Sequence, residues 1–146
     1  MSIDLGIFFG GSTMTVSYFR DDKASIIVNE AGDRTTPSLV AITDNEYSIG
    51  LPAKQNMIRN SKNTAPFAKY LIGCSSLESI NQDLLKRIDC EISLNDKKEI
   101  VFNMEKNGKP YQLSLSEAIE KELKYLNGTT IFFLFKYSKF LIIQLN

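Results

Sequence analysis

The first fifty residues alternate between short apolar runs and turn-forming residues, a pattern typical of antiparallel β-structure. Isoleucine, valine, threonine and aromatic residues fill the runs, and these residue types favour a pleated, half-buried surface. Glycine, asparagine, aspartate and proline separate the runs. The pattern predicts a β-meander and then a hairpin with its turn at Asp44-Asn45, from strands at 2–9, 14–19, 24–28, 38–43 and 46–49.

After residue 50 the apolar spacing becomes that of short helices and then returns to that of strands. A proline near the start of the first helical stretch and a glycine after the second agree with the residue preferences of helix ends. Helices are predicted at 51–60, 65–72 and 81–87, and strands at 88–94, 99–105 and 110–115.

The clearest helix is predicted at residues 116–125. Ser114 and Glu117 have the spacing of a capping box, in which each side chain bonds the other residue's backbone amide. An apolar stripe at helical spacing is expected to face the core, and it consists of Ala118, Ile119, Leu123 and Leu126.

The last twenty residues differ in character from the helix before them, because they are mostly apolar and carry Lys136 and Lys139. A transmembrane span needs about 20 apolar residues and tolerates central lysines poorly. The alternatives are a membrane anchor, a buried final strand, or the aberrant end of a truncated or mis-spliced product. The third agrees best with residues 127–146, so no membrane association is expected.

Composition narrows the function classes. Seventeen basic residues balance seventeen acidic ones, so no net positive charge attracts nucleic acid. Nucleic acid is therefore not expected as a direct partner. The sequence has no histidine, which excludes histidine triads and histidine metal sites within this chain. Cys74 and Cys90 fit neither a zinc pattern nor a disulfide framework, and we expect free thiols in a cytosolic protein.

Two neighbouring stretches compete for the role of a phosphate-binding turn. Asp4 and the following Gly6 offer a carboxylate beside a glycine, as a site for a metal–nucleotide complex requires. Residues 10–13, Gly-Gly-Ser-Thr, offer closely spaced amides and hydroxyls that suit an anion, but no acid lies beside them.

Two later stretches carry a resemblance to a known family. "NEAGDRTTPSLVAITDNEYSIGLPAKQ" at 29–55 and "NTAPFAKYLIG" at 63–73 resemble the start of the ATPase domain of the heat-shock 70 kDa (Hsp70) chaperones, which are actin-like ATPases. The resemblance covers roughly residues 1–126 and is most specific between 29 and 73. It implies ATP and ADP as ligands, bound between two lobes.

The resemblance also implies roles for single residues. The family's first turn has an acid that holds Mg²⁺ through water, followed by a glycine and two threonines that contact phosphate. Without gaps, Gly10 matches the glycine, Gly11 and Ser12 match the threonines, and Phe8 matches the acid. We therefore expect Gly10, Gly11, Ser12 and Thr13 to bind phosphate, no carboxylate for Mg²⁺, and no role for Asp4. Lys69 matches the family lysine that positions the attacking water, so it is the candidate catalytic residue.

The degraded turn resembles that of a divergent, ribosome-associated branch of the family. This resemblance implies a co-chaperone in nascent-chain folding that binds ATP with weak or absent hydrolysis. The implied partners are a J-domain protein of the zuotin type, the ribosome and a conventional Hsp70 chaperone. The alternatives are a non-enzymatic interaction module or a non-functional truncated product.

The expected fold class is α/β, an incomplete ribonuclease H-like or actin-like ATPase lobe. A mixed-sheet meander with flanking helices is expected at 1–38 and 116–126, with a small α+β subdomain inserted at 39–115 and a divergent apolar tail at 127–146. Because the second lobe would follow residue 126 in the family, no complete active site is expected from this chain.

Overall fold

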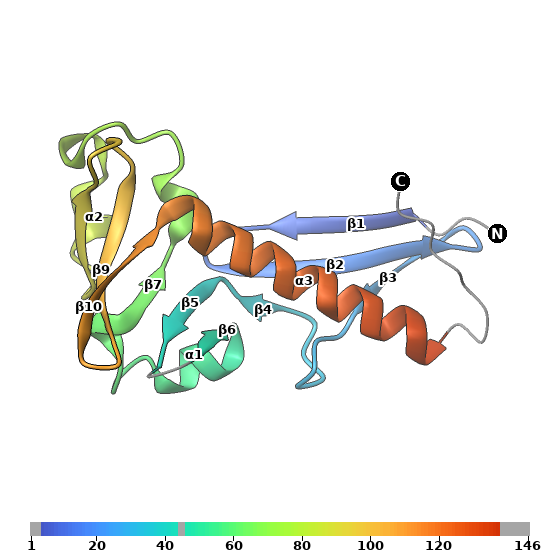
Figure 1. The fold of residues 1–146 in the computed structure, drawn as a ribbon. Coiled ribbons are helices and arrows are strands. Elements are labelled where there is room, and N and C mark those ends of the chain that lie inside the picture. The colour runs from blue at the N-terminus through green and yellow to red at the C-terminus, as the bar shows by residue number, and fades with distance from the viewer. Residues whose placement is uncertain (1–3, 44–45, 138–146) are drawn as a thin grey trace.

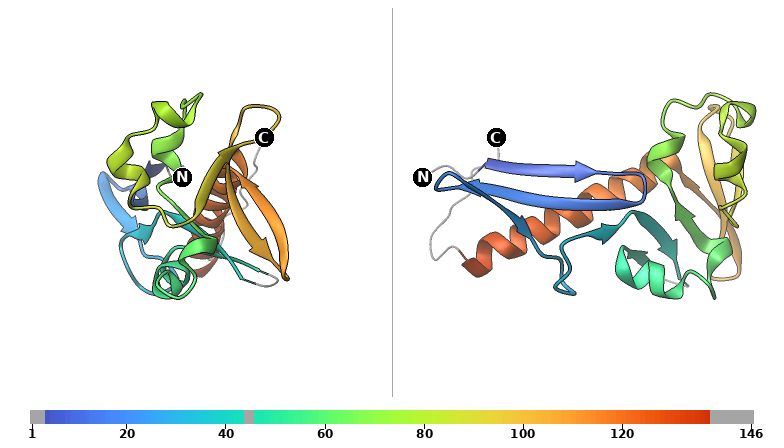
Figure 2. Two further views of the ribbon diagram at one scale, coloured as in Figure 1. Left: turned by 90° about the vertical axis from the view of Figure 1, so that its left-hand side faces the viewer. Right: turned by 180° about the vertical axis from the view of Figure 1, so that it is seen from behind.

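The computed structural model describes residues 4–43 and 46–137 of the 146-residue chain. Its strands form three antiparallel sheets, and one long helix, α3 (Leu115–Tyr137), contacts all three. Figure 1 shows α3 running from the sheet formed by residues 91–114, at one end of the molecule, along the strands formed by residues 4–27, at the other end. The turned views in Figure 2 show the same separation between the two ends.

The first sheet is the predicted meander. It contains β1 (Asp4–Phe9), β2 (Thr13–Arg20), β3 (Lys23–Ile27) and the short β4 (Thr36–Pro37), which pairs with β2. Asp21 and Asp22 close the β2–β3 hairpin with positive φ angles of 52° and 58°, the conformation that a tight primed turn requires. The prediction of three consecutive antiparallel strands is confirmed.

The other two sheets and the short helices form the opposite end of the molecule. One sheet has the order β6–β5–β7, with β5 (Leu39–Ile42), β6 (Tyr47–Ile49) and β7 (Thr64–Pro66). The other has the order β10–β9–β8, with β8 (Glu91–Leu94), β9 (Ile100–Lys106) and β10 (Lys109–Ser114). The short helices are α1 (Leu51–Asn56), α2 (Gln82–Leu85) and the 3₁₀ helices η1 (Ser61–Asn63), η2 (Ala68–Leu71) and η3 (Leu77–Ser79). The predicted Asp44-Asn45 turn lies outside the described residues.

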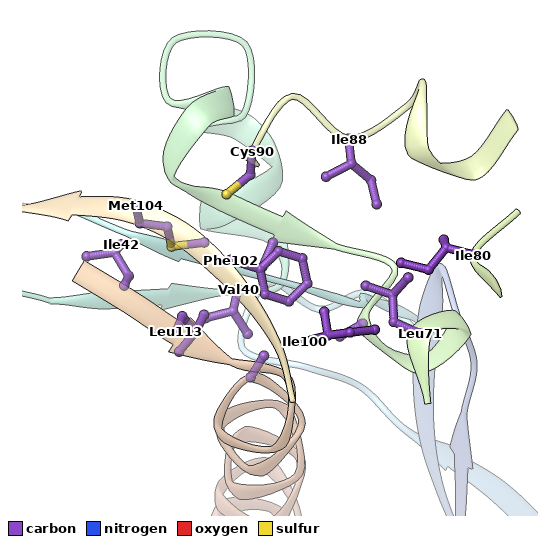
Figure 3. Close-up of a cluster of buried hydrophobic side chains, with 13 residues drawn as sticks. Val40, Ile42, Leu71, Ile80, Ile88, Cys90, Ile100, Phe102, Met104 and Leu113 are labelled. Atoms are coloured by element: carbon purple, nitrogen blue, oxygen red, sulfur yellow. The ribbon is translucent and has the colours of Figure 1, made fainter. Parts of the chain in front are cut away.

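The larger hydrophobic core lies between these two sheets and the start of α3. Phe102, Leu71, Ile42 and Leu113 are completely buried there, and Figure 3 shows side chains from both sheets gathered around Phe102. A second, much smaller cluster under the meander consists of Met14, Val16, Ile27 and Leu126. The apolar packing is therefore concentrated at one end of the molecule.

The helix predicted at 65–72 is wrong in its first part. Ala65 and Pro66 belong to β7, and only residues 68–71 turn as a 3₁₀ helix. Pro66 has no N–H to donate, a loss that an edge strand such as β7 tolerates, and residues 64–66 pair with β5 instead of starting a helix. Phe67, with φ of 61°, then separates the strand from the helix.

Helix α3 differs from the predicted helix in both its length and its buried face. It continues through Tyr137, so a buried strand is wrong for residues 127–137, while 138–146 lie outside the described residues. Among the helices described, none has the length and apolarity to cross a membrane. Ala118 and Leu126 are buried as expected, but Leu123 is 42% exposed and Glu122 is buried in its place.

The predicted capping box at the start of α3 forms only in part. The Glu117 amide donates to Ser114 Oγ at 3.1 Å, as predicted. The Glu117 carboxylate instead accepts hydrogen bonds from the hydroxyls of Tyr47 (2.8 Å) and Tyr111 (3.1 Å). This bonding joins strands β6 and β10 to the first turn of α3.

Candidate functional site

The predicted phosphate-binding residues form the tight turn between β1 and β2. Phe9 pairs with Met14, and residues 10–12 connect the two strands. The Gly10 amide donates to the Thr13 carbonyl at 3.0 Å. Beside the turn, the Ser38 amide donates to the Ser12 carbonyl at 2.9 Å, which fixes the turn against the start of β5.

Asp4, the competing acid, lies at the opposite end of this hairpin. It pairs with Phe19, six residues along β1 from Gly10, and a strand rises about 3.3 Å per residue. The Asp4 backbone is therefore about 20 Å from the turn. The structure places Phe8, and not Asp4, next to the turn.

Lys69 reaches the turn from η2, across sixty residues of sequence. Its ammonium donates a hydrogen bond to the Phe9 carbonyl, and its Nζ lies 5.8 Å from the centre of the Phe9 ring. The structure thus brings Lys69 to Phe9, the residue directly before the four candidate residues Gly10, Gly11, Ser12 and Thr13. All five were proposed from the sequence, and their juxtaposition is a tertiary contact.

Two aromatic rings lie directly on the glycines of the turn. A Cβ atom added to Gly10 would lie 2.8 Å from Cε1 of Phe8, and one added to Gly11 would overlap Cε2 of Tyr70. Both glycines are buried, whereas Phe8 and Tyr70 are 60% and 56% exposed. The sequence analysis did not single out Tyr70. The one signal that could have found it is its position directly after Lys69.

The turn offers several hydrogen-bond donors. Within the described ranges, the amides of Gly11 and Ser12 form no hydrogen bond, and the residues Ser12 and Thr13 are exposed. Successive free amides with nearby hydroxyls and a lysine suit an anion such as phosphate.

The turn lacks the donors that a divalent cation prefers. Mg²⁺ is bound by hard oxygens, usually through one or two carboxylates and retained waters. Phe8 offers no oxygen from its side chain, and the part of the chain that the structure describes contains no group of three acidic or thiol side chains that could hold a metal. The residues around the turn fit a phosphate anion and do not fit Mg²⁺.

A buried carboxyl group lies behind the turn. Ser38, whose amide holds the turn, also donates its hydroxyl to Glu122 Oε1 at 3.0 Å. Glu122 is completely buried, and its Oε2 has no partner among the described residues. Burial raises the pKa of this carboxyl from its ordinary 4.5 to about 7, although the Ser38 hydrogen bond opposes the shift. No sequence pattern pointed to this group, because Glu122 falls outside the apolar stripe predicted for the helix.

The chain is similar to known proteins over most of its length. The family model described as Hsp70 protein matches residues 3–130. Heat shock 70 kDa protein 14 of Homo sapiens is 34% identical over 124 residues, which cover 84% of this chain and 21% of that protein. The 14-B protein of Xenopus laevis is 32% identical over 77% of this chain and 20% of its own length. The Danio rerio protein is 42% identical over 47% of this chain and 14% of its own length.

The match and the fold support each other. The chain spans about a fifth of the length of the human relative. The meander, the other two sheets and the helix α3 all lie within the matched residues or begin there. The fold is mixed α/β with antiparallel sheets and corresponds to part of one lobe of an actin-like ATPase domain. The chain belongs to the Hsp70 family.

Proposed function

We propose that this chain binds the phosphate groups of ATP or ADP through the turn at residues 10–13, with weak or absent hydrolysis. Hsp70 nucleotide-binding domains bind these nucleotides generally. The observation that carries the proposal is the contact between Lys69 and the Phe9 carbonyl, because it brings a cation to the residue directly before the turn that has the free amides. Those are the groups that phosphate recognition needs.

Weak hydrolysis follows from the chemistry at Phe8. In phosphoryl transfer, a metal ion bridges the phosphate oxygens and neutralises the developing charge. A phenyl ring in place of the family's acid cannot accept a hydrogen bond from a metal-bound water, and this ring lies against Gly10. Lys69 would still contribute positive charge, so binding is retained while the barrier to transfer stays high.

The wider role that we propose is that of a cytosolic co-chaperone for nascent chains. Its support is the similarity to the heat shock 70 kDa protein 14 sequences together with the ribosome-associated branch that the degraded turn resembles. The partners in this proposal are a J-domain protein of the zuotin type, the ribosome and a conventional Hsp70 chaperone.

Calorimetry of the 146-residue chain with ATP and with ADP tests nucleotide binding. We expect heat of binding at or below millimolar nucleotide, with little change when Mg²⁺ is added. Lys69→Gln should weaken affinity about tenfold, which is about 1.4 kcal/mol. Lys97→Gln, an exposed lysine in the β8–β9 connection, is the matched control and should leave affinity unchanged. Absence of heat at millimolar nucleotide would contradict the proposal.

A second candidate function, an interaction module without nucleotide, has one observation in its favour. Apolar side chains in and just after the outer strands of the first sheet are largely exposed, namely Leu5, Ile7, Ile26 and Val28. Exposed apolar surface of this kind often marks a protein contact. Ile7→Lys should then abolish binding of the purified J-domain partner without changing the calorimetric result for ATP. Unchanged partner binding would exclude β1 from such a contact.

A further inference from the structure

The aromatic ring of Tyr70 packs against Gly11, a turn residue whose amide has no partner among the described residues. Gly11 is buried although it lies in a surface hairpin, and the Tyr70 ring occupies the volume that a Cβ atom would fill, with Cε2, Cζ and Cδ2 all within 2.7 Å of that position. The Gly11 amide makes no hydrogen bond with any residue that the structure describes. A covered N–H without an acceptor is a donor that water cannot easily satisfy.

The Tyr70 ring is not fixed in this position by the core. The side chain is 56% exposed, and the ring's aromatic neighbour, Phe67, lies with its centroid 6.4 Å away at a tilt of 43°. In the described residues its hydroxyl has no hydrogen-bond partner. Exposed side chains change rotamer on the picosecond to nanosecond scale, so the ring is free to leave Gly11 without unfolding of η2.

We propose that Tyr70 is a gate on the anion-binding turn, whose ring must swing away from Gly11 before a phosphate group reaches the free amides. This inference rests on the proposed function and adds to it. The neighbouring Lys69 contacts Phe9 from the same 3₁₀ helix, so one short segment supplies both the charge that attracts the anion and the ring that excludes it. Each phosphate contact then competes with the contact between Tyr70 and the turn.

The test compares binding of inorganic tripolyphosphate and of ATP to the 146-residue chain and its variants by calorimetry. Tyr70→Ala removes the gate and should tighten binding of both probes about tenfold. Tyr70→Phe retains the ring and should retain the low affinity. The matched control is Ile72→Ala, because Ile72 is also 56% exposed but lies beyond η2; its affinity should equal that of the wild type.

The outcomes separate the gate from the proposed function. Tighter binding in Tyr70→Ala, with the affinities of Tyr70→Phe and Ile72→Ala unchanged, supports the gate. Equal or weaker binding in Tyr70→Ala overturns the gate while leaving nucleotide binding intact. Absence of binding in all variants, including the wild type, overturns both. If Tyr70→Phe also binds more tightly, the ring is not the gating group and the proposal fails.

A measurement without ligand tests the contact itself. Gly11→Ala adds a methyl group that collides with the Tyr70 ring, so it should destabilise the wild type more than it destabilises Tyr70→Ala. Unfolding curves of the two single variants and the double variant measure this coupling. Additive effects would show that the ring does not cover Gly11, and they would overturn the gate.

Discussion

The two ends of this molecule differ in how many apolar side chains they bury. Around Phe102, two sheets and the start of α3 bury a continuous apolar core. At the other end, the cluster of buried apolar side chains between the meander and α3 is small, with Met14, Val16, Ile27 and Leu126 among the described residues, and β1 exposes apolar side chains. The candidate site lies at the junction, where η2 from the packed end contacts the β1–β2 turn.

This difference indicates where stability and function reside. The packed end contains the larger buried apolar cluster, and burial of apolar area is the main favourable term in folding. The meander is supported by α3 and by Ser38, which joins the turn to a buried carboxyl group. Changes in the packed end should therefore alter stability, and changes near the turn should alter binding.

The largest expected effect is the loss of stability when the centre of the packed core is emptied. Phe102→Ala should lower the free energy of unfolding by about 4 kcal/mol, because a fully buried ring is replaced by a cavity. Phe19→Ala, at a position 46% exposed in the meander, is the control and should cost less than about 1 kcal/mol. Urea unfolding measures both. Equal losses would show that the two ends are packed alike.

The next effect is a pH dependence of stability that arises at Glu122. The raised pKa means that the folded protein keeps a proton that the unfolded chain has already lost, so stability should fall as pH rises from about 4.5 to about 7. The full difference is about 3 kcal/mol. Glu122→Gln should remove this slope while keeping the Ser38 contact. Denaturant midpoints measured at intervals from pH 4.5 to 8 test it, and a slope that persists in Glu122→Gln would assign it to other groups.

Residue types at the turns predicted the hairpins, because the conformation of a tight turn depends on the residues in the turn itself. The two glycines after the first apolar run placed the β1–β2 turn, and Asn107-Gly108 marked the β9–β10 hairpin, where φ angles of 54° and 70° need these residue types. The resemblance to the family then selected the residues of the candidate site, including Lys69, which no periodicity would have singled out.

The remaining features depend on contacts between distant residues. Residues 65–66 joined a sheet because β5 offered a pairing edge, and Glu122 became buried because Ser38 came to lie against α3. The position of Tyr70 on Gly11 likewise results from the docking of η2 on the turn. Sequence spacing within one element contains none of this information.

A smaller effect should appear when an acid is restored beside the turn. Phe8→Asp places a carboxylate next to Gly10 and removes the ring that covers it, so ATP affinity should become dependent on Mg²⁺, with a gain of about tenfold when the ion is present. Phe8→Asn is the matched control, since it removes the ring without adding charge. Calorimetry with and without Mg²⁺ distinguishes the two variants. An equal response in both would show that the ring, and not the missing acid, limits metal-dependent binding.

The smallest expected effect belongs to the other acid of the hairpin. Asp4→Ala should leave ATP affinity within about twofold of the wild type, because β1 holds this residue about 20 Å from the turn. The same variant in the Phe8→Asp background should keep the full response to Mg²⁺, since the two carboxylates act at opposite ends of the strand. A loss of binding in Asp4→Ala would mean that the hairpin pairs in another register when nucleotide is present. Phe8 would then no longer occupy the position of the family's acid, and the chemical basis for weak hydrolysis would be lost with it.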